Sequence, residues 1–228
     1  MLNKLLSYFS VFEICLWCCS ILLPVISFVI FDHENYIMLA ASIIGATYLI
    51  FNAKGNPIGQ VLLVIFSILY GIISYSFSYY GEMVTYLGMS TPMAILALIS
   101  WLKNPYGGNS LEVKSNSLRK TEYIFIFALT AVITFIFYFI LKHFHTANLI
   151  PSTLSVTTSF FAVYLTLRRS RYFTLAYAAN DIILIYLWIL ASLSNITYMS
   201  AAVCFVMFLV NDIYGFINWT KMHKKQNQ

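Results

Sequence analysis

Two carboxylates stand inside long apolar stretches of the sequence, and they are the first candidates for chemistry. Asp181 and Asp212 each follow an asparagine, in the pairs Asn180-Asp181 and Asn211-Asp212. A carboxylate at the centre of a bilayer costs about 2.5–3.5 kcal/mol on insertion scales, so such a residue usually faces a cavity or a partner. The alternative is a hydrogen bond between helices, which contributes about 0.6 kcal/mol on average. We interpret both residues as candidate binding residues.

Helical spacing brings aromatic and amide side chains to the first carboxylate. Tyr177, Asp181 and Trp188 differ by four and seven positions, so they share one helix face, and Asn180 flanks it. A carboxylate beside rings and amides suits a planar, cationic, amide-bearing molecule. The rings stack on it, the π faces and the carboxylate attract its charge, and asparagine pairs with amides or hydroxyls.

Two further apolar stretches supply the remaining candidates. Asn211 and Tyr214 lie on one helix face near Asp212, and Gln60 shares a face with small residues in an earlier stretch. The predicted binding residues are therefore Gln60, Tyr177, Asn180, Asp181, Trp188, Asn211, Asp212 and Tyr214.

The composition places these residues in a membrane protein. Hydrophobic residues make up 61% of the 228 positions and charged residues 9%, against about 25% in an ordinary soluble domain. A soluble fold of this size could not cover so much apolar surface. The net charge of +5 follows the membrane topology described below, so we expect no nucleic-acid partner.

Eight apolar stretches are long enough to cross a bilayer as helices, which takes about 17–25 residues each. Strands are excluded because the stretches are too long and too continuously apolar for a barrel. The predicted spans are Ile14–Phe31, Tyr36–Ala53, Ile58–Gly81, Met83–Trp101, Tyr123–Leu141, Leu149–Leu167, Tyr172–Leu193 and Tyr198–Trp219.

Lysine and arginine fall almost entirely on one side of the predicted membrane. With eight spans, 12 of the 13 basic residues lie on the side of the N-terminus, and Lys142 lies on the other. Cytoplasmic loops carry the excess of positive charge, so that side is predicted to be the cytoplasm. We therefore expect a multi-pass protein of the cell membrane with both termini inside.

The spans form two similar groups of three. One group ends at Trp101 and the other at Trp219; Lys54 precedes the first tryptophan by 47 residues, and Arg171 precedes the second by 48. One span separates the groups, so both enter the membrane in the same sense. This predicts an all-α, 3+1+3 parallel-repeat core, as in the SWEET sugar transporters, with a solute site between the repeats.

The predicted segments follow from this arrangement. They are an N-terminal segment with an accessory membrane helix (1–35), a first three-helix repeat (36–102), a cytoplasmic linker with a linker helix (103–148), a second three-helix repeat (149–220) and a cytoplasmic tail (221–228).

A set of short motifs extends from Tyr36 to Lys221. It comprises Ser42-Ile-Ile-Gly-Ala46, Ala53-Lys-Gly55, Leu69-Tyr-Gly-Ile-Ile-Ser-Tyr75, Tyr79-Tyr-Gly-Glu-Met83, Thr91-Pro-Met93, Trp101-Leu-Lys-Asn104 and Asn211-Asp-Ile-Tyr-Gly215. Together the motifs resemble those of the nicotinamide riboside transporters, the PnuC family. The resemblance implies facilitated uptake of nicotinamide riboside through a 3+1+3 core. It also implies trapping of the solute by a cytosolic kinase that acts downstream without a required contact.

The sequence departs from that family at positions that line the family's solute site. If the asparagine of the family's Trp-x-x-Trp motif matches Asn180, its two tryptophans fall at Phe173 and Ala176. In the fourth span, Tyr86 and Ala94 stand where the family often has asparagine and glutamine. Thiamin and deoxynucleosides, which relatives on this scaffold are thought to carry, are therefore alternative solutes.

Other classes of function stay open at this level. Asp181 and Asp212 could form the carboxylate pair of an intramembrane enzyme, and the chain could be a non-transporting membrane subunit. We expect no cofactor, no metal and no catalytic residue, because His143-Phe-His145 has no further ligand nearby and no nucleotide-binding motif is present. The expected partners are a nucleoside-like small molecule and the lipid bilayer, and the sequence leaves a homo-oligomer open.

Overall fold

The computed structural model of the chain describes residues 8–76 and 80–228. Lys4 and residues 77–79 of the predicted third span, which include Tyr79, lie outside the described residues. Eleven helical segments and a two-stranded hairpin make up the described part of the chain. In order, they are α2 (Val11–Phe31), α3 (Tyr36–Ala53), α4 (Ile58–Ser76), α5 (Tyr80–Thr85), a π-helical segment (Tyr86–Ser90), α6 (Thr91–Leu102), β1 (Pro105–Tyr106), β2 (Asn109–Val113), α7 (Lys120–His143), α8 (Leu149–Leu167), α9 (Phe173–Ser192), a 3₁₀ turn (Ile196–Tyr198) and α10 (Met199–Gln226).

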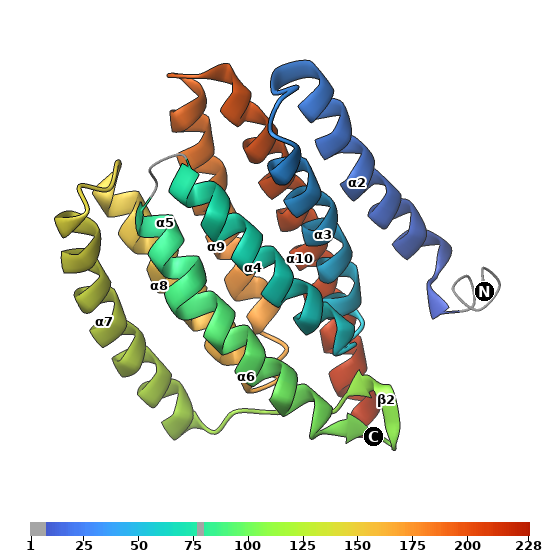
Figure 1. Cartoon of the computed structure of the whole chain (residues 1–228). Helices are drawn as coiled ribbons and strands as arrows, with labels where there is room; N and C mark the ends of the chain where they lie inside the picture. The colour runs from blue at the N-terminus through green and yellow to red at the C-terminus, as the bar shows by residue number, and fades with distance from the viewer. Residues whose placement is uncertain (1–7, 77–79) are drawn as a thin grey trace.

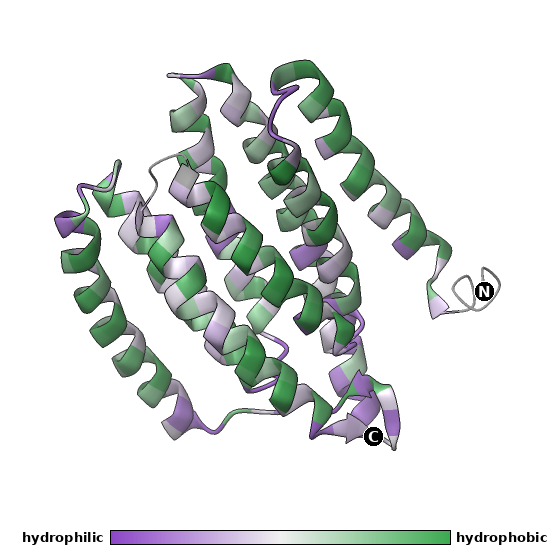
Figure 2. Cartoon of the chain, viewed as in Figure 1, coloured by the Kyte–Doolittle hydropathy of each residue, from purple (hydrophilic) through white to green (hydrophobic). Residues whose placement is uncertain are grey.

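Eight helices within the described ranges are long and apolar enough to cross a membrane, which confirms the predicted number of spans. The bounds of α3 and α8 agree with the prediction at both ends. The last helix runs past Trp219 to Gln226. Figure 2 shows the apolar residues along the helices and the polar residues gathered in the connections and at the C-terminal end. The helices therefore have the hydropathy profile of membrane spans.

A short hairpin lies in the predicted cytoplasmic linker of the fold that the sequence predicted to be all-α. β1 and β2 pair antiparallel through a turn at Gly107 and Gly108, whose φ angles are +56° and +77°. Glycine adopts these angles without steric cost. The end of β2 is anchored to the helical core because Val113 N–H donates to the Gly55 carbonyl at 2.9 Å.

Six helices form a closed ring. Around it, each helix contacts the next: α3 with α4, α4 with α6, α6 with α8, α8 with α9, α9 with α10, and α10 with α3 again. We name α3, α4 and α5–α6 the first triplet, and α8, α9 and α10 the second triplet. The triplets therefore meet along two seams, α6 with α8 and α10 with α3 (Figure 1).

Two helices lie outside the ring, on opposite sides of the molecule (Figure 1). The accessory helix α2 contacts α3 and α10, and the linker helix α7 contacts α8. A capping box starts α2: Ser10 N–H donates to the Glu13 carboxylate at 2.6 Å, and Glu13 N–H donates to Ser10 Oγ at 3.3 Å. The outer faces of α2 and α7 expose many large apolar side chains, as expected of helices that face lipid.

The triplets are bonded to each other at the end of the ring that carries most of the basic residues, which we call the basic end. On the α6–α8 seam, Trp101 Nε1 donates to the Thr166 carbonyl at 2.9 Å. Beside it, Ser100 Oγ donates to the Leu167 carbonyl at 2.9 Å. Both acceptors belong to the last turn of α8, where backbone carbonyls lack helical partners.

The α10–α3 seam repeats this pattern. Trp219 Nε1 donates to the Asn52 carbonyl, and Asn218 Nδ2 donates to the Ala53 carbonyl, both at 2.7 Å. The two tryptophan rings meet at the centre with centroids 5.4 Å apart, and both are fully buried. Each triplet thus caps the first helix of the other.

The turns after α3 and α8 are also alike. Gly55 N–H donates to the Asn52 carbonyl and Arg169 N–H donates to the Thr166 carbonyl, and both residues have positive φ angles, +66° and +56°. By its place in the turn, Lys54 therefore corresponds to Arg168, three residues before the Arg171 that the sequence spacing suggested. The expected parallel repeat stays a prediction, and these matched contacts are the positions at which it can be compared.

Candidate functional site

The ring encloses a small internal cavity that we call the central cavity. Its volume is about 30 Å³, room for about one water molecule, whereas ligand pockets usually hold about 300–1,000 Å³. The structure therefore shows a closed conformation. Every helix of the ring except α6 contributes to the lining, and the π-helical segment contributes in its place. The lining residues are Tyr48, Leu63, Phe66, Ser67, Tyr86, Ser90, Ser159, Tyr177, Asn180, Asp181, Leu184, Phe205 and Phe208.

The two predicted carboxylates lie together at this cavity. Asp181 lines it, and Asp212 on α10 lies within hydrogen-bond distance of Asp181. Each is only 4% exposed. Neither forms an ion pair with a lysine, arginine or histidine of the described residues. The structure thus brings the Asp-Asp pair to the centre of the ring.

Asn180 is held by hydroxyl groups from the neighbouring helix. Ser155, Thr158 and Ser159 of α8 all donate to Asn180 Oδ1, at 3.2, 2.9 and 3.1 Å. Three donors on one oxygen fix the orientation of the amide, and no described residue accepts from its Nδ2 group. Because Asn180 lines the central cavity, that group can donate to a carbonyl or hydroxyl of a bound molecule.

A local change of helix type places two more side chains in the cavity. Pro92 has no N–H to donate to the carbonyl four residues earlier, so the α-helical pattern fails just before it. The chain forms a π-helical segment there, closed by the bond from Thr91 N–H to the Tyr86 carbonyl. Tyr86 and Ser90, at the two ends of this segment, both line the cavity. Single π-helical turns of this kind often mark functional sites.

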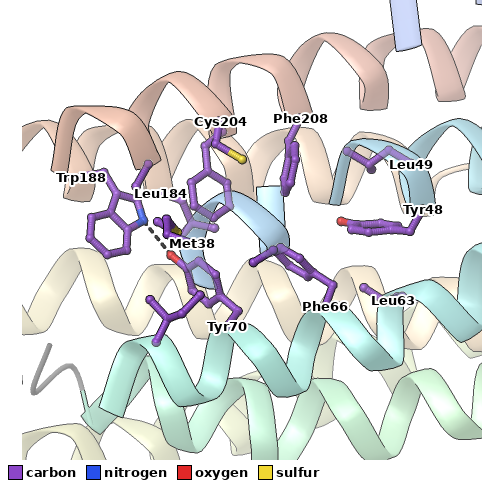
Figure 3. Close-up of a cluster of buried hydrophobic side chains, with 14 of the residues drawn as sticks. Met38, Tyr48, Leu49, Leu63, Phe66, Tyr70, Leu184, Trp188, Cys204 and Phe208 are labelled. Carbon is purple, nitrogen blue, oxygen red and sulfur yellow. Dashed lines mark hydrogen bonds between the residues drawn. The ribbon is translucent and has the colours of Figure 1, made fainter. Parts of the chain in front are cut away.

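Aromatic rings form much of the wall. Tyr48 and Phe66 have centroids 5.4 Å apart, and Phe66 and Phe208 have centroids 5.6 Å apart (Figure 3). Tyr86 lies 4.5 Å from the ring of Tyr70. A planar solute that entered between these rings could stack on them.

Trp188 lies beside the cavity, towards the end of the ring that we call the opposite end. Its Nε1 donates to the Tyr70 hydroxyl at 2.7 Å, which joins α9 to α4 (Figure 3). The indole lines a second cavity of about 20 Å³ with Glu82, Asn148 and Ser152. The tryptophan lines the second cavity and not the central cavity.

Three predicted binding residues face other partners. Asn211 Nδ2 donates to Ser20 Oγ of α2 at 2.7 Å. The Tyr214 hydroxyl donates to Glu13, also on α2, at 2.8 Å. Gln60 Nε2 donates to Asn52 Oδ1 at 2.8 Å near the basic end. None of the three lines the central cavity.

The positions at which the sequence departs from the family's motifs also lie in different parts of the structure. Tyr86 lines the central cavity, whereas Phe173 contacts Trp101 and Trp219 at the basic end. Ala176 lines a wide apolar groove of about 720 Å³ between α7, α8 and α9. A tryptophan at residue 176 would therefore extend towards that groove.

Sequence reasoning missed several contributions of α3, α4 and α8 to the cavity. Tyr48 and Ser67 line it without a charge or motif to mark them, and Ser159 belongs to a serine- and threonine-rich stretch of α8. That stretch was the available signal, because hydroxyls in a membrane helix need partners. No group of three or more metal-ligating side chains occurs within residues 8–76 and 80–228.

A ring of membrane-spanning helices around a closed cavity with polar groups defines a class of protein, the solute transporters, whose substrate sites lie near the middle of the membrane. The chain belongs to the family whose model is described as "Nicotinamide mononucleotide transporter", which matches residues 35–221. It is therefore a membrane transporter and not an enzyme, and the intramembrane-enzyme and non-transporting interpretations are wrong.

Named relatives agree with this assignment. The chain is 28% identical over 202 residues to the nicotinamide riboside transporter PnuC of Neisseria mucosa, covering 87% of this chain and 77% of the relative. It is 24% identical over 197 residues to the protein of the same name from Haemophilus influenzae, covering 85% and 83%. A solved structure titled "Crystal structure of the Vitamin B3 transporter PnuC" matches with a TM-score of 0.84 and 26% identity, over 96% of this chain and 94% of that one.

Proposed function

We propose that the chain carries nicotinamide riboside across the cell membrane by facilitated diffusion. The observation that carries this proposal is the composition of the central cavity. It combines a buried carboxyl pair, an oriented asparagine amide and aromatic walls, with no lysine, arginine or histidine among its lining residues. Nicotinamide riboside presents a cationic ring, an amide and sugar hydroxyls, which match these groups one for one. The printed names of the relatives support the same solute.

The same cavity disfavours the phosphorylated form named in the family description. A phosphate group would bring up to two negative charges to a cavity that is lined by the Asp181 carboxyl group, with Asp212 beside it. Phosphate binding normally relies on arginine, lysine or a helix N-terminus. The riboside is therefore the better match than the mononucleotide.

The proposal also specifies which end faces the cytoplasm and what drives transport. The basic end faces the cytoplasm because it carries most of the lysine and arginine residues. No ion or nucleotide drives the step, and a cytosolic kinase traps the imported solute by phosphorylation without contacting the transporter.

A binding and counterflow experiment tests the solute. Purified protein is titrated with nicotinamide riboside, nicotinamide mononucleotide, thiamin and deoxythymidine, and liposomes loaded with unlabelled solute are tested for uptake of labelled solute. We expect binding and counterflow with nicotinamide riboside and neither with the mononucleotide. Tighter binding of thiamin or deoxythymidine would replace the proposed solute.

The carboxylate has its own test. Asp181→Asn keeps the shape of the side chain but removes its charge-assisted contact, so binding of nicotinamide riboside should weaken by roughly 1–3 kcal/mol. A neutral deoxynucleoside should be affected much less. Unchanged binding of nicotinamide riboside by the folded variant would show that Asp181 is structural.

Thiol labelling tests the orientation. In a chain without its native cysteines, Asn109→Cys on the hairpin should be shielded from an impermeant reagent added outside cells. Ser194→Cys, in the turn after α9, should react. Labelling in the reverse pattern would overturn the orientation.

A further inference from the structure

The apolar groove between α7, α8 and α9 lies outside the helix ring, and we call it the lateral groove. Its volume is about 720 Å³. Its walls are mainly aromatic and aliphatic, and two of them, Phe127 on α7 and Leu175 on α9, are 62% and 49% exposed. In a membrane such a groove is filled by lipid chains or by another protein, because unfilled apolar surface loses dispersion contacts.

A polar pocket continues the lateral groove at the basic end, and we call it the head pocket. Its volume is about 200 Å³. Tyr123 and Tyr172 line both spaces, so the two are contiguous. The other polar residues of the head pocket are Asn116, Ser117, Ser170, Arg171 and His223. The lining thus changes from apolar to polar at two tyrosines, a residue type that is enriched where hydrocarbon meets lipid headgroups.

The head pocket carries positive charge. Arg171 lines it and forms no ion pair with a carboxylate of the described residues. Its guanidinium group lies 4.9 Å from the ring of Tyr172 and donates to the hydroxyl of that residue at 2.9 Å. No aspartate or glutamate of the described ranges lines the pocket, and Glu122, next to it in the chain, is paired with Arg168. An anion can therefore reach Arg171 without displacing a carboxylate.

Two helices begin at the head pocket. α7 begins at Lys120, between the lining residues Leu118 and Tyr123, and α9 begins at Phe173, directly after Tyr172. The N-terminus of a helix carries partial positive charge and favours anions. The two helix ends and Arg171 thus favour the same kind of ligand. The adjoining groove requires that this ligand also have an apolar part.

We propose that the lateral groove and the head pocket together bind one anionic glycerophospholipid. Its phosphate lies in the head pocket beside Arg171, and its acyl chains fill the groove. Thr130 and Ala179 line the groove seven residues beyond the two tyrosines, so the groove extends about 10 Å from the head pocket along α7 and α9. Anionic headgroups are attracted to basic pockets between membrane helices in this way.

Charge favours a lipid over a second copy of the chain. A copy in the same orientation would bring its own excess of basic residues to the depth of the head pocket, where Arg171 already lies. A free phosphate ion would occupy the head pocket but leave the lateral groove unfilled. A phospholipid of the leaflet at the basic end supplies both the phosphate and the chains.

The lipid site adjoins the central cavity through one side chain. Thr158 lines the lateral groove and donates to Asn180 Oδ1 at 2.9 Å, and Asn180 lines the central cavity. A lipid in the groove therefore packs against a residue that orients the Asn180 amide. The lipid site itself requires no solute, so it can be tested independently of the proposed function.

The experiment is native mass spectrometry of the purified full-length protein, stripped of lipid in detergent. Dioleoylphosphatidylglycerol and dioleoylphosphatidylcholine are added separately at equal concentrations, and the lipid retained per chain is counted. We expect one phosphatidylglycerol per chain, bound about fivefold or more tightly than phosphatidylcholine. Excess glycerol 3-phosphate should not displace it. Equal retention of the two lipids, or displacement by glycerol 3-phosphate, would overturn the inference.

Two pairs of variants locate the lipid. Arg171→Gln should weaken phosphatidylglycerol binding about fivefold or more, whereas Lys103→Gln removes one charge from an exposed position at the same end, outside the head pocket, and should not. Ala179→Phe adds a ring inside the lateral groove and should also weaken binding. Ala128→Phe adds the same ring to an exposed position of α7 outside the groove, and binding should be unchanged.

The remaining outcomes decide against the lipid site. If both members of either pair of variants bind phosphatidylglycerol equally well, the lipid is bound elsewhere. If the same spectra show an oligomer without bound lipid, and Ala179→Phe dissociates it, the lateral groove is an interface between copies of the chain. The comparison of the two lipids on the wild-type protein decides even if a variant fails to fold.

Discussion

The two ends of the helix ring are closed in different ways. At the basic end, tryptophan and its neighbour on each seam donate to backbone carbonyls at the end of a helix in the other triplet. At the opposite end, Trp188 and Tyr70 join α9 to α4 through a bond between two side chains. A side-chain pair can separate by rotation, whereas a helix end that loses its cap keeps an unsatisfied carbonyl. We therefore expect the opposite end to open more easily.

The largest expected effect comes from removing a tryptophan at the basic end. Trp219→Ala should lower stability by about 3–5 kcal/mol, because it empties a fully buried site and removes the donor to Asn52. Trp101→Ala should lower stability by a similar amount. The thermal unfolding midpoint of the purified protein measures this loss.

Trp17 provides the control for this comparison. It lies on α2 outside the ring, is only partly buried and donates to Thr47 at 3.2 Å. Trp17→Ala should therefore lower the midpoint clearly less than Trp219→Ala. Equal losses would show that the tryptophans at the basic end stabilise the fold no more than Trp17 does.

A smaller loss of stability is expected at Asn218, the residue next to Trp219. Pro57 has no N–H, so the buried Ala53 carbonyl depends on Asn218 Nδ2 for a donor. Asn218→Ala should lower stability by about 1–3 kcal/mol. Asn227→Ala, which removes an exposed amide near the chain end, should leave the unfolding midpoint unchanged. An unchanged midpoint in Asn218→Ala would mean that water replaces the amide.

The smallest effect on stability is expected at the opposite end. Tyr70→Phe removes the acceptor of Trp188 Nε1 and should cost about 0.5–1.5 kcal/mol. Its main consequence should be opening: buried Cys204, in the same cluster as Tyr70 and Trp188, should react about fivefold faster with a small thiol reagent. The rate is measured in a chain whose exposed cysteines, Cys15, Cys18 and Cys19, are replaced by serine.

A matched variant at the basic end sharpens the last prediction. Ser100→Ala removes one bond between the triplets there, and it should leave the reactivity of Cys204 unchanged. If Ser100→Ala accelerates the reaction as much as Tyr70→Phe does, the two ends open together and the proposed difference between them is wrong.

The membrane spans were predictable because each depends on a local property of the sequence. A run of apolar residues long enough for the bilayer forms a helix wherever it stands, so α3 and α8 begin and end where expected. The hairpin at β1 and β2 was missed because its strands are short and polar, and a glycine-rich turn alone does not reveal strand pairing.

The candidate site could be predicted from the sequence only in part, because spacing identifies the residues on one face of a helix but not the helix that this face contacts. Asp181 and Asn180 lie at the central cavity. Asn211 and Tyr214, chosen by the same spacing argument, face Ser20 and Glu13 of the accessory helix. Their helix, α10, contacts α2, α3 and α9, and the sequence does not tell which of these a polar residue faces. Their predicted role in solute binding stays a prediction.

The seam between α3 and α10 also sets the order in which the molecule can be completed during synthesis. The first helix of the ring is made early, and its last turn receives its caps from Trp219 and Asn218, which are made near the end of the chain. Until the final span is inserted, the Ala53 carbonyl lacks this donor and the ring stays open to lipid. A chain that stops before Trp219 therefore exposes an uncapped helix end, which gives cellular quality control a physical feature by which to distinguish unfinished molecules from finished ones.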